Sequence, residues 1–278
     1  MLSKETDRSG DIMYDFGFIG TGNMGSALAK GVCRKVSPDR IAVSDKMNGK
    51  AQALASELLC HAQSVEETAE NCRFIFIGVK PQMLDSLMTE IKPVLEKRKD
   101  RFVLISMLAG TEIKTVEAKV GFPCPVIRIM PNVACLIGEG MTLCAKNAEV
   151  TDEEYAFFTE AMEMTGKTDN IDEKLIDAAS AVSGCGPAYA FMMIEALADG
   201  AVDCSVPRDK AYLYAAKMLE GSAKLFLETG KSPSQLKDSV CSPGGTTIEG
   251  VRALEKYGFR ASVFEAVRAA YEKNKALS

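Results

Sequence analysis

The sequence predicts an α/β protein, in which a doubly wound parallel sheet in the N-terminal part is followed by an all-helical C-terminal part. Short apolar runs alternate with helix-like stretches as far as Thr168, and a glycine-rich turn joins the first run to a helix. From Asp172 onward nearly every stretch has helical periodicity. The 278 residues, 47% of them apolar, suffice for two such domains. We place these domains at residues 14–171 and 172–278.

The first apolar run, Phe16–Ile19, leads into the pattern Gly20-x-Gly22-x-x-Gly25 and then into a helix. A second strand follows and ends at Asp45, about 20 residues beyond Gly25. This strand, turn and helix order is typical of a Rossmann dinucleotide site. In such a site the first glycine permits the turn and the second lets the backbone approach a pyrophosphate. The third lets helix and strand pack closely.

The residues after the second strand bear on the choice of nicotinamide cofactor. Asp45 would suit the 2′-hydroxyl of NAD. Ser44 and Lys46 beside it could instead hold the 2′-phosphate of NADP. The sequence therefore predicts NADPH or NADH and leaves the choice open.

Three further apolar runs, separated by helix-like stretches such as Gln82–Lys97, continue the predicted parallel sheet. Ligands of such sheets bind beyond the carboxyl ends of the strands, so the residues after each run are candidate site residues, although each segment could equally be a plain loop. The runs are Phe74–Val79, Phe102–Met107 and Pro125–Met130, and the candidate segments are Val79–Gln82, Ser106–Gly110 and Met130–Asn132.

The C-terminal part is expected to consist of helices with few polar faces. Its first helical stretch should break at Gly184–Pro187, and a second should begin at Pro207 and end at Gly230. Alanine, leucine, methionine and aromatic residues lie on more than one face of these helices, which therefore need burial on several sides. This pattern favours a homodimer or higher homo-oligomer over a compact monomeric bundle.

A second glycine-rich turn, Gly244-Gly245, precedes a predicted helix. Thr246 and Glu249 have the spacing of a capping box, which alone could explain a helix start. A cap does not require two glycines, however, whereas the close approach of a small anion does. We therefore favour a ligand site, with the hydroxyl groups of Thr246 and Thr247 beside the anion.

Composition excludes several classes of function. The net charge of −5 and the pI near 5.2 argue against a nucleic-acid partner. No uninterrupted apolar segment approaches the roughly 20 residues that cross a bilayer, and Met1 to Ile12 is polar, as in a loose tail. The nine cysteines form no C-x-x-C pair and indicate a reducing compartment, hence the cytoplasm. The single histidine, His61, leaves no histidine cluster for a metal site.

Several motifs together resemble the pyrroline-5-carboxylate reductase family, whose members catalyse the last step of proline synthesis. The motifs are IGTGNMG, VKPQ, MPN, SGCGPAYAF, ADG, VPRDKA and QLKDSVCSPGGTTIEGVRALE. The resemblance covers nearly everything from Met13 to the C-terminus, and the stretch Gln235–Leu254 is its most specific part.

The resemblance implies an N-terminal Rossmann domain, a helical dimerisation domain and an active site shared between the cofactor loop of one subunit and helices at the dimer interface. It implies cofactor contacts at Ile19, Gly20, Thr21, Gly22, Asn23 and Met24, in addition to Gly25, and at Val79, Lys80, Pro81, Ser106 and Ala109. It implies substrate contacts at Glu173, Asp238, Val240, Ser242, Gly244, Gly245, Thr246 and Thr247.

The implied reaction is transfer of a hydride from NADPH or NADH to the cyclic imine pyrroline-5-carboxylate, which gives L-proline. The Gly244-Gly245 amides would cradle the substrate carboxylate, and Thr247 would form a hydrogen bond with the ring nitrogen. An iminium is already electrophilic, so catalysis would consist mostly of holding the reacting atoms roughly 3–3.5 Å apart.

Two other functions fit part of the pattern. A hydroxyacid dehydrogenase of the same two-domain plan would need a basic lysine soon after SGCGPAY, but the next lysine, Lys210, comes about 20 residues after Tyr189. A non-catalytic dinucleotide sensor would bind the cofactor but would not need a second anion loop.

Overall fold

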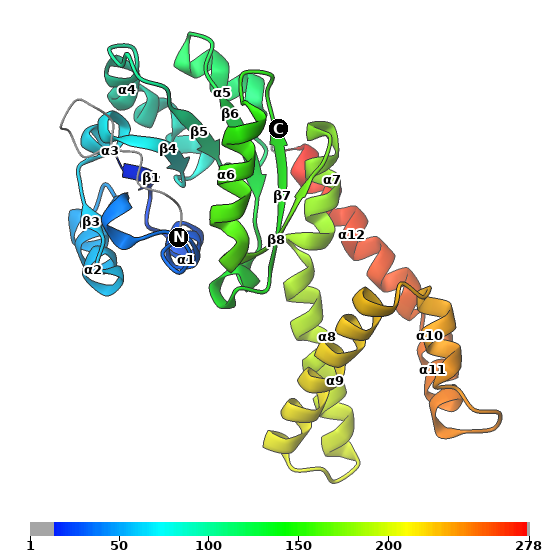
Figure 1. The fold of residues 1–278 in the computed structure, drawn as a ribbon. Helices are drawn as coiled ribbons and strands as arrows, with labels where there is room; N and C mark the ends of the chain where they lie inside the picture. The colour runs from blue at the N-terminus through cyan, green and yellow to red at the C-terminus, as the bar shows by residue number, and fades with distance from the viewer. Residues whose placement is uncertain (1–13, 277–278) are drawn as a thin grey trace. The chain divides into compact units, whose positions relative to one another are not determined.

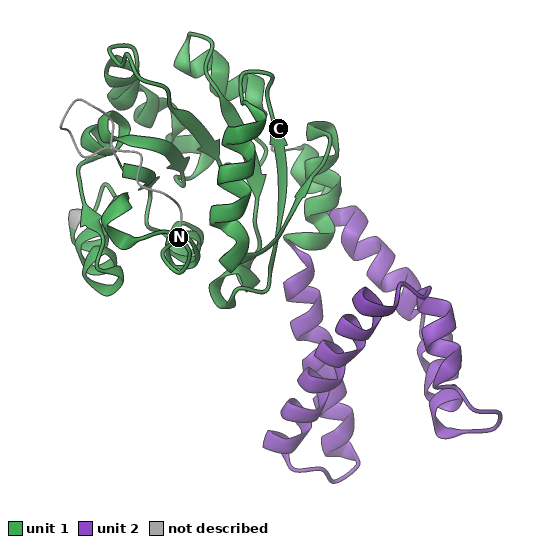
Figure 2. Cartoon of the chain, in the orientation of Figure 1, with its two compact units in different colours: residues 1–184, 271–278 green, residues 185–270 purple. Residues whose placement is uncertain are grey.

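The computed structural model describes residues 14–276, which form two compact units (Figures 1 and 2). The first unit extends to Gly184 and includes the chain from Tyr271 onward, and the second is Cys185–Ala270. The predicted polar tail, Met1 to Ile12, lies outside the described residues. The boundary between the two compact units follows α7 (Glu173–Ser183), whereas the predicted domain boundary at residue 171 precedes that helix. The domain boundary at residue 171 stays a prediction.

The first unit is built on an eight-stranded sheet with the order β3-β2-β1-β4-β5-β6-β7-β8. Its strands are β1 Tyr14–Ile19, β2 Ile41–Ser44, β3 His61–Ala62, β4 Cys72–Ile77, β5 Val103–Ser106, β6 Val126–Met130, β7 Gly140–Lys146 and β8 Gly166–Asn170. The first six are parallel, β7 is antiparallel to β6, and β8 is parallel to β7. The predicted doubly wound parallel sheet is therefore confirmed for six strands, and two further strands extend it.

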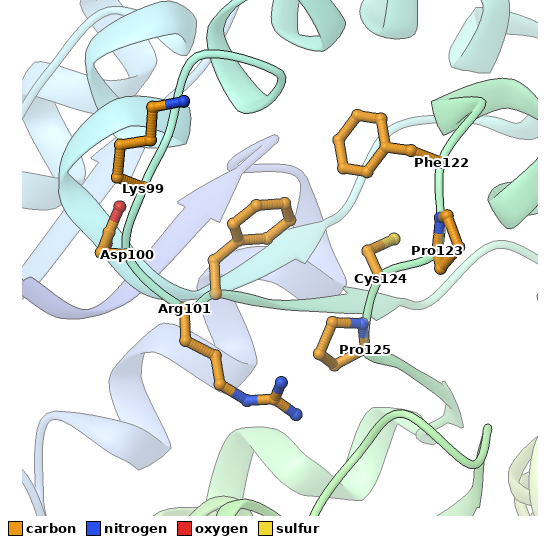
Figure 3. Close-up of a pocket in the computed structure, with 8 residues that line it drawn as sticks. Lys99, Asp100, Arg101, Phe122, Pro123, Cys124 and Pro125 are labelled. Carbon is orange, nitrogen blue, oxygen red and sulfur yellow. The ribbon is translucent and has the colours of Figure 1, made fainter.

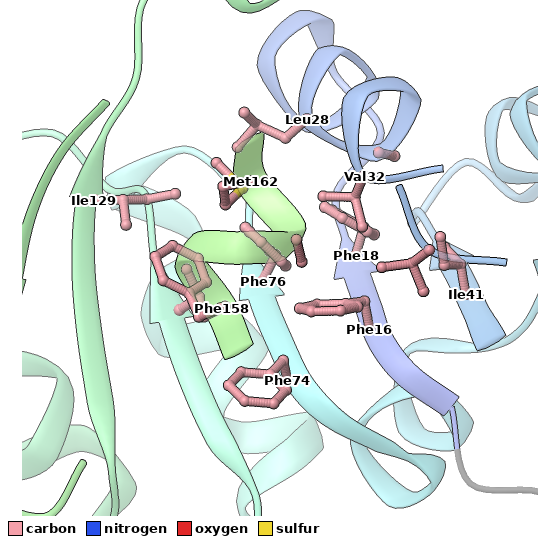
Figure 4. Packing of buried hydrophobic residues seen from close by; sticks show 14 of the residues in the cluster. Phe16, Phe18, Leu28, Val32, Ile41, Phe74, Phe76, Ile129, Phe158 and Met162 are labelled. Carbon is pink, nitrogen blue, oxygen red and sulfur yellow. The ribbon is translucent and has the colours of Figure 1, made fainter. Parts of the chain in front are cut away.

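Helices cover both faces of this sheet. Side chains alternate along β1, so that Phe16 and Phe18 enter one apolar cluster while Ile19 enters the other. In the first cluster the rings of Phe18 and Phe76 stack with centroids 4.3 Å apart, and Phe158 of α6 packs on the same face (Figure 4). Burial on both faces explains why the strands of this unit are almost continuously apolar.

The helices of the first unit connect consecutive strands or follow the last one. They are α1 Asn23–Val32, α2 Asn48–Leu58, α3 Val65–Asn71, α4 Leu84–Leu95, α5 Ile113–Val120, α6 Asp152–Met162 and α7 Glu173–Ser183. Short 3₁₀ turns lie at η1 Pro38–Arg40, η2 Pro81–Met83, η3 Val133–Ile137 and η4 Glu163–Thr165.

The second unit is entirely helical in the described chain, as predicted. It contains α8 Gly186–Asp203, α9 Arg208–Thr229, α10 Pro233–Ser239, α11 Thr246–Lys256 and most of α12 Phe259–Lys275. The break predicted at Gly184–Pro187 separates α7 from α8. Pro207 is the N-cap of α9, and Gly230, with a φ of 62°, ends it, as its sequence predicts.

Many large apolar side chains of the second unit are exposed in the single chain, among them Phe191, Met192, Leu213 and Phe264. The stretch Glu173–Asp203, which comprises α7 and α8, is long and apolar enough to cross a bilayer by length and composition, although that is weak evidence for a membrane span. This stretch is not an uninterrupted apolar segment, because it contains charged residues such as Glu195 and Asp199 and breaks between α7 and α8. Apolar helices of this kind are equally suited to burial against another protein surface.

Candidate active site

The first glycine loop lies where the order of the sheet reverses, between β1 and β4. Gly20 has a φ of 101°, which disfavours any side chain, and a Cβ atom there would lie 2.6 Å from the carbonyl oxygen of Gly78. The turn after β1 is thus packed directly against the turn after β4. In open α/β sheets this switch point is the place where dinucleotides bind.

The start of α1 leaves room for an anion. Gly22, its N-cap, is exposed, and apart from its neighbours in the chain no described atom would lie within 4 Å of a Cβ placed there. The first turn contains no acidic residue, and no described side chain caps its amides. Gly25 is buried directly beneath the Gly20 carbonyl, where a side chain would clash. These features fit the pyrophosphate of a dinucleotide.

Asp45 follows β2 and is tied to the glycine loop. Its Oδ2 accepts hydrogen bonds from the Thr21 amide (2.8 Å) and the Thr21 hydroxyl (3.0 Å), and its Oδ1 accepts one from the Met47 amide (2.9 Å). Partial burial opposes ionisation, but these hydrogen bonds outweigh it and hold the pKa of Asp45 below its ordinary value. Ser44 is fully buried beside the Phe18 carbonyl, which argues against a direct contact between its side chain and a cofactor.

The other predicted cofactor residues follow β4 and β5, at the same edge of the sheet. Val79 is half-buried, Lys80 and Pro81 are exposed, and the Met107 amide donates to the Ile77 carbonyl (3.3 Å). Ser106 ends β5, fully buried, and its hydroxyl has no partner among the described residues.

The remaining predicted cofactor residues differ in exposure: Ile19 is buried, Thr21 is nearly buried, Met24 is half-buried, and Asn23, Lys46 and Ala109 are exposed. The loops after β1, β2, β4 and β5 therefore meet at one edge.

A pocket of about 270 Å³ lies at the opposite edge of this sheet (Figure 3). It is lined by Lys99–Phe102, which precedes β5, and by Phe122–Pro125, which precedes β6. The amino ends of parallel strands meet there, whereas dinucleotides bind beyond the carboxyl ends. This pocket is consequently separate from the candidate cofactor site.

The second glycine loop is a tight turn. The Gly245 amide donates to the Ser242 carbonyl (3.0 Å), and Gly244, at the third position of the turn, has a φ of 66°. Proline at the second position and glycine with positive φ at the third are typical of a type II turn. Apart from its chain neighbours, no described atom would lie within 4 Å of a Cβ on Gly244, so the glycine serves the backbone conformation and leaves this side of the loop open.

The start of α11 differs from the capping-box alternative. Gly245 is the N-cap, Thr246 is the first helical residue, and no described side chain caps the first-turn amides. Glu249 pairs instead with Arg252 (2.7 Å). The amides of this turn are therefore available to an anion, and the side chains of Thr246 and Thr247 are exposed beside them.

Three other predicted substrate residues belong to the same unit. Asp238 forms an ion pair with Lys237 (2.6 Å), while Val240 and Ser242 are exposed. Because α10 ends at Ser239, Val240 is its C-cap and Ser242 opens the tight turn. Their roles in binding stay predictions.

Glu173 opens α7 in the first unit and is already engaged. Its Oε1 accepts a hydrogen bond from the Ile113 amide (2.7 Å) at the start of α5 and lies 3.4 Å from Arg128 Nη1. Arg128 Nη2 pairs with Asp177 (2.7 Å). Arg128 is only 1% exposed, and a charged residue inside the apolar run PVIRIM is the sequence signal that marks it. This cluster joins α7 to the sheet.

Asn132, in the candidate segment after β6, also organises the fold. Its side-chain oxygen accepts hydrogen bonds from the Ala134 and Met141 amides (3.2 and 3.3 Å), and its amide group donates to the Ser183 carbonyl (2.9 Å). These contacts hold η3, β7 and the end of α7 together, which favours a structural role for this residue.

The predicted cofactor residues thus gather at one edge of the sheet in the first unit. Glu173, a predicted substrate residue, also belongs to the first unit. The predicted residues from Asp238 to Thr247 gather around one turn of the second unit. Each group includes the start of a helix whose N-cap is a glycine without a side-chain cap.

Comparisons with known proteins agree with this organisation. Residues 173–277 match the family described as pyrroline-5-carboxylate reductase dimerisation, and residues 15–110 match the family described as NADP oxidoreductase coenzyme F420-dependent. A pyrroline-5-carboxylate reductase of Escherichia coli is 42% identical over 265 residues, which cover 94% of this chain and 97% of the relative.

Solved structures give the same result. The pyrroline carboxylate reductase of Plasmodium falciparum, solved with NADP bound, has a TM-score of 0.83 and 33% identity, and the match covers 96% of this chain and 99% of that one. The pyrroline-5-carboxylate reductase of Coxiella burnetii has a TM-score of 0.87 and 29% identity, over 96% and 99% of the two chains. The chain belongs to the pyrroline-5-carboxylate reductase family.

Proposed function

We propose that this protein reduces pyrroline-5-carboxylate to L-proline, the last step of proline biosynthesis, with NADH or NADPH as the reductant. The observation that carries the proposal is the start of α11, where an open glycine turn precedes first-turn amides that no described side chain caps. A cyclic imine with one carboxylate is a small anion that fits such a site. Membership of the family supplies the identity of that anion.

The residues at the switch point of the sheet would hold the cofactor. The α1 amides from Gly22 onward would face the pyrophosphate, and the turns after β4 and β5 would flank the nicotinamide side. A bound reduced nicotinamide supplies a hydride. The family model that covers residues 15–110 supports this assignment.

The proposed role of Thr247 is to orient the substrate through its hydroxyl group, which is exposed in the first turn of α11. The hydroxyl would form a hydrogen bond with the ring nitrogen while the first-turn amides hold the carboxylate. Reduction of the imine consumes one hydride and one proton, and the proton would reach the nitrogen from solvent or through Thr247. This arrangement needs no histidine, which agrees with the position of His61 as an exposed residue of β3.

We also propose that the protein works as a homodimer or a higher homo-oligomer in the cytoplasm. The match of residues 173–277 to a dimerisation family supports the assembly, and so do the exposed apolar side chains of α8, α9 and α12. The nine cysteines are all unpaired, which fits a reducing compartment.

Purified protein mixed with pyrroline-5-carboxylate and either reduced cofactor tests the activity. We expect oxidation of the cofactor and formation of proline in equal amounts, both dependent on the imine. A protein that is folded and binds cofactor, but forms no proline with either reductant, would contradict the proposal and favour the dehydrogenase or sensor alternatives.

A further inference from the structure

We propose that Asp45 makes this chain select NADH over NADPH. The inference rests on the proposed function in so far as it takes the first glycine loop to be the cofactor site. It goes further by assigning the choice of cofactor to one side chain, and the position, the hydrogen bonds and the charge surroundings of that side chain each support it.

The position of Asp45 matches the ribose end of a dinucleotide site. β2 lies beside β1 in the sheet, with Ile19 opposite Ser44, so Asp45 is the first residue beyond the strand that neighbours the glycine loop. In dinucleotide-binding sheets an acidic residue at this place accepts hydrogen bonds from the ribose hydroxyls of NAD. NADP carries a phosphate at the same 2′ position.

The Asp45 carboxylate cannot easily turn away from that position. Thr21 holds Oδ2 through its amide and its hydroxyl, and the Met47 amide holds Oδ1. A carboxylate can accept about four hydrogen bonds, so these three leave capacity for a ribose hydroxyl. The same three contacts keep the group ionised, and a phosphate placed beside it would meet a fixed like charge.

The neighbouring groups do not form a receptor for a 2′-phosphate. Ser44 is fully buried, and the Thr21 hydroxyl already donates to Asp45. Lys50 interacts electrostatically with Asp45 itself, and Lys46 interacts with Glu90. Each of these two exposed lysines therefore has a carboxylate of this chain nearby. The preference for NADH follows because the Asp45 carboxylate can accept a hydrogen bond from the ribose 2′-hydroxyl of NADH but repels the 2′-phosphate of NADPH.

Direct binding measurements without the imine test the inference. We would titrate the protein with NADH and with NADPH, following the fluorescence of the cofactor itself because the chain contains no tryptophan. We expect NADH to bind at least about tenfold more tightly, the scale of one hydrogen bond to a charged group. Equal binding, or tighter binding of NADPH, would overturn the inference without any variant.

The variants Asp45→Ser and Asp45→Asn show whether this side chain sets the preference. We expect both to weaken NADH binding and to strengthen NADPH binding, so that the ratio of the two dissociation constants falls by about tenfold or more. A ratio unchanged in both folded variants would overturn the assignment to Asp45. The same preference should appear in the wild type when adenosine 5′-monophosphate is compared with adenosine 2′,5′-bisphosphate, and its absence there would also count against the assignment.

Asp39→Asn is the matched control. Asp39 lies in η1, before β2 and so at the opposite end of that strand, and it accepts a hydrogen bond from Ser37. The substitution removes the same charge, so the ratio should stay at its wild-type value. A change as large as that of Asp45→Asn would assign the preference to net charge and overturn the inference. Because binding is measured without imine, selective NADH binding by a protein that forms no proline would contradict only the proposed function.

Discussion

Thr247 is the single side chain to which a chemical contact with the substrate nitrogen is assigned. It is exposed in the first turn of α11, beside the open amides of the helix start. We expect Thr247→Val, which keeps the shape but removes the hydroxyl, to lower kcat by roughly 10- to 1000-fold, the scale of losing one preorganised donor. Steady-state kinetics measure this, with Thr247→Ser as the control that keeps a hydroxyl. Wild-type turnover by Thr247→Val would remove Thr247 from the mechanism.

We expect Arg128 to contribute to stability. It is buried within β6 and contacts both Glu173 and Asp177 of α7. Removing the buried guanidinium loses both ion pairs at once, so we expect Arg128→Met to lower the free energy of unfolding by about 3 kcal/mol. The midpoint of urea unfolding measures the change, and Arg128→Lys, which keeps the charge, should lose less. A midpoint equal to that of the wild type would show that the cluster does not stabilise the fold.

Substitutions at the start of α11 distinguish the contribution of a backbone amide to substrate binding from that of a side-chain hydroxyl. Thr246 is the first helical residue, a position where proline is tolerated because its missing N–H is not needed by the helix. Thr246→Pro should keep the helix but remove one amide from the proposed carboxylate site. We expect KM for the imine to rise by about tenfold or more.

Thr246→Ala is the comparison for that experiment, because it removes the hydroxyl and keeps the amide. Its KM should rise less than that of Thr246→Pro. Circular dichroism checks that both variants retain the helices. Equal KM values for the two variants would show that this amide does not hold the carboxylate.

Elements with strong local signals were predictable from the sequence, and those that depend on tertiary contacts were not. The glycine turn at Gly20 and the limits of α9 follow from residues that fix backbone conformation. β8, by contrast, is a polar edge strand with the sequence GKTDN, and no alternation of apolar residues marks it.

The same distinction holds within the candidate site. The two glycine loops could be located from their motifs, because each glycine pattern is local. The hydrogen bonds from Thr21 to Asp45 and the contact of Arg128 with Glu173 join residues far apart in the chain. Spacing therefore could not identify them. The capping box at Thr246 did not form because the N-cap of the helix is Gly245, one residue earlier than that pattern requires.

For the whole molecule, the exposed apolar helices predict an assembly. Phe191 on α8 is 63% exposed in the single chain, and Leu227 on α9 is 76% exposed. We expect light scattering to give a mass of at least two chains, and we expect Phe191→Glu to shift the population toward smaller species because it would bury an unpaired charge. A fully active monomer at the assay concentration would contradict the proposed oligomer.

Transfer of a hydride from the cofactor to the imine carbon defines the proposed reaction, and an isotope label on the cofactor follows that hydride. The protein would be given pyrroline-5-carboxylate and a reduced nicotinamide cofactor deuterated at the transferred position, and the proline would be analysed by mass spectrometry. We predict proline that carries a single deuterium, on the ring carbon that was the imine carbon. Unlabelled proline, or no proline from folded protein that binds the cofactor, would contradict the proposed hydride transfer.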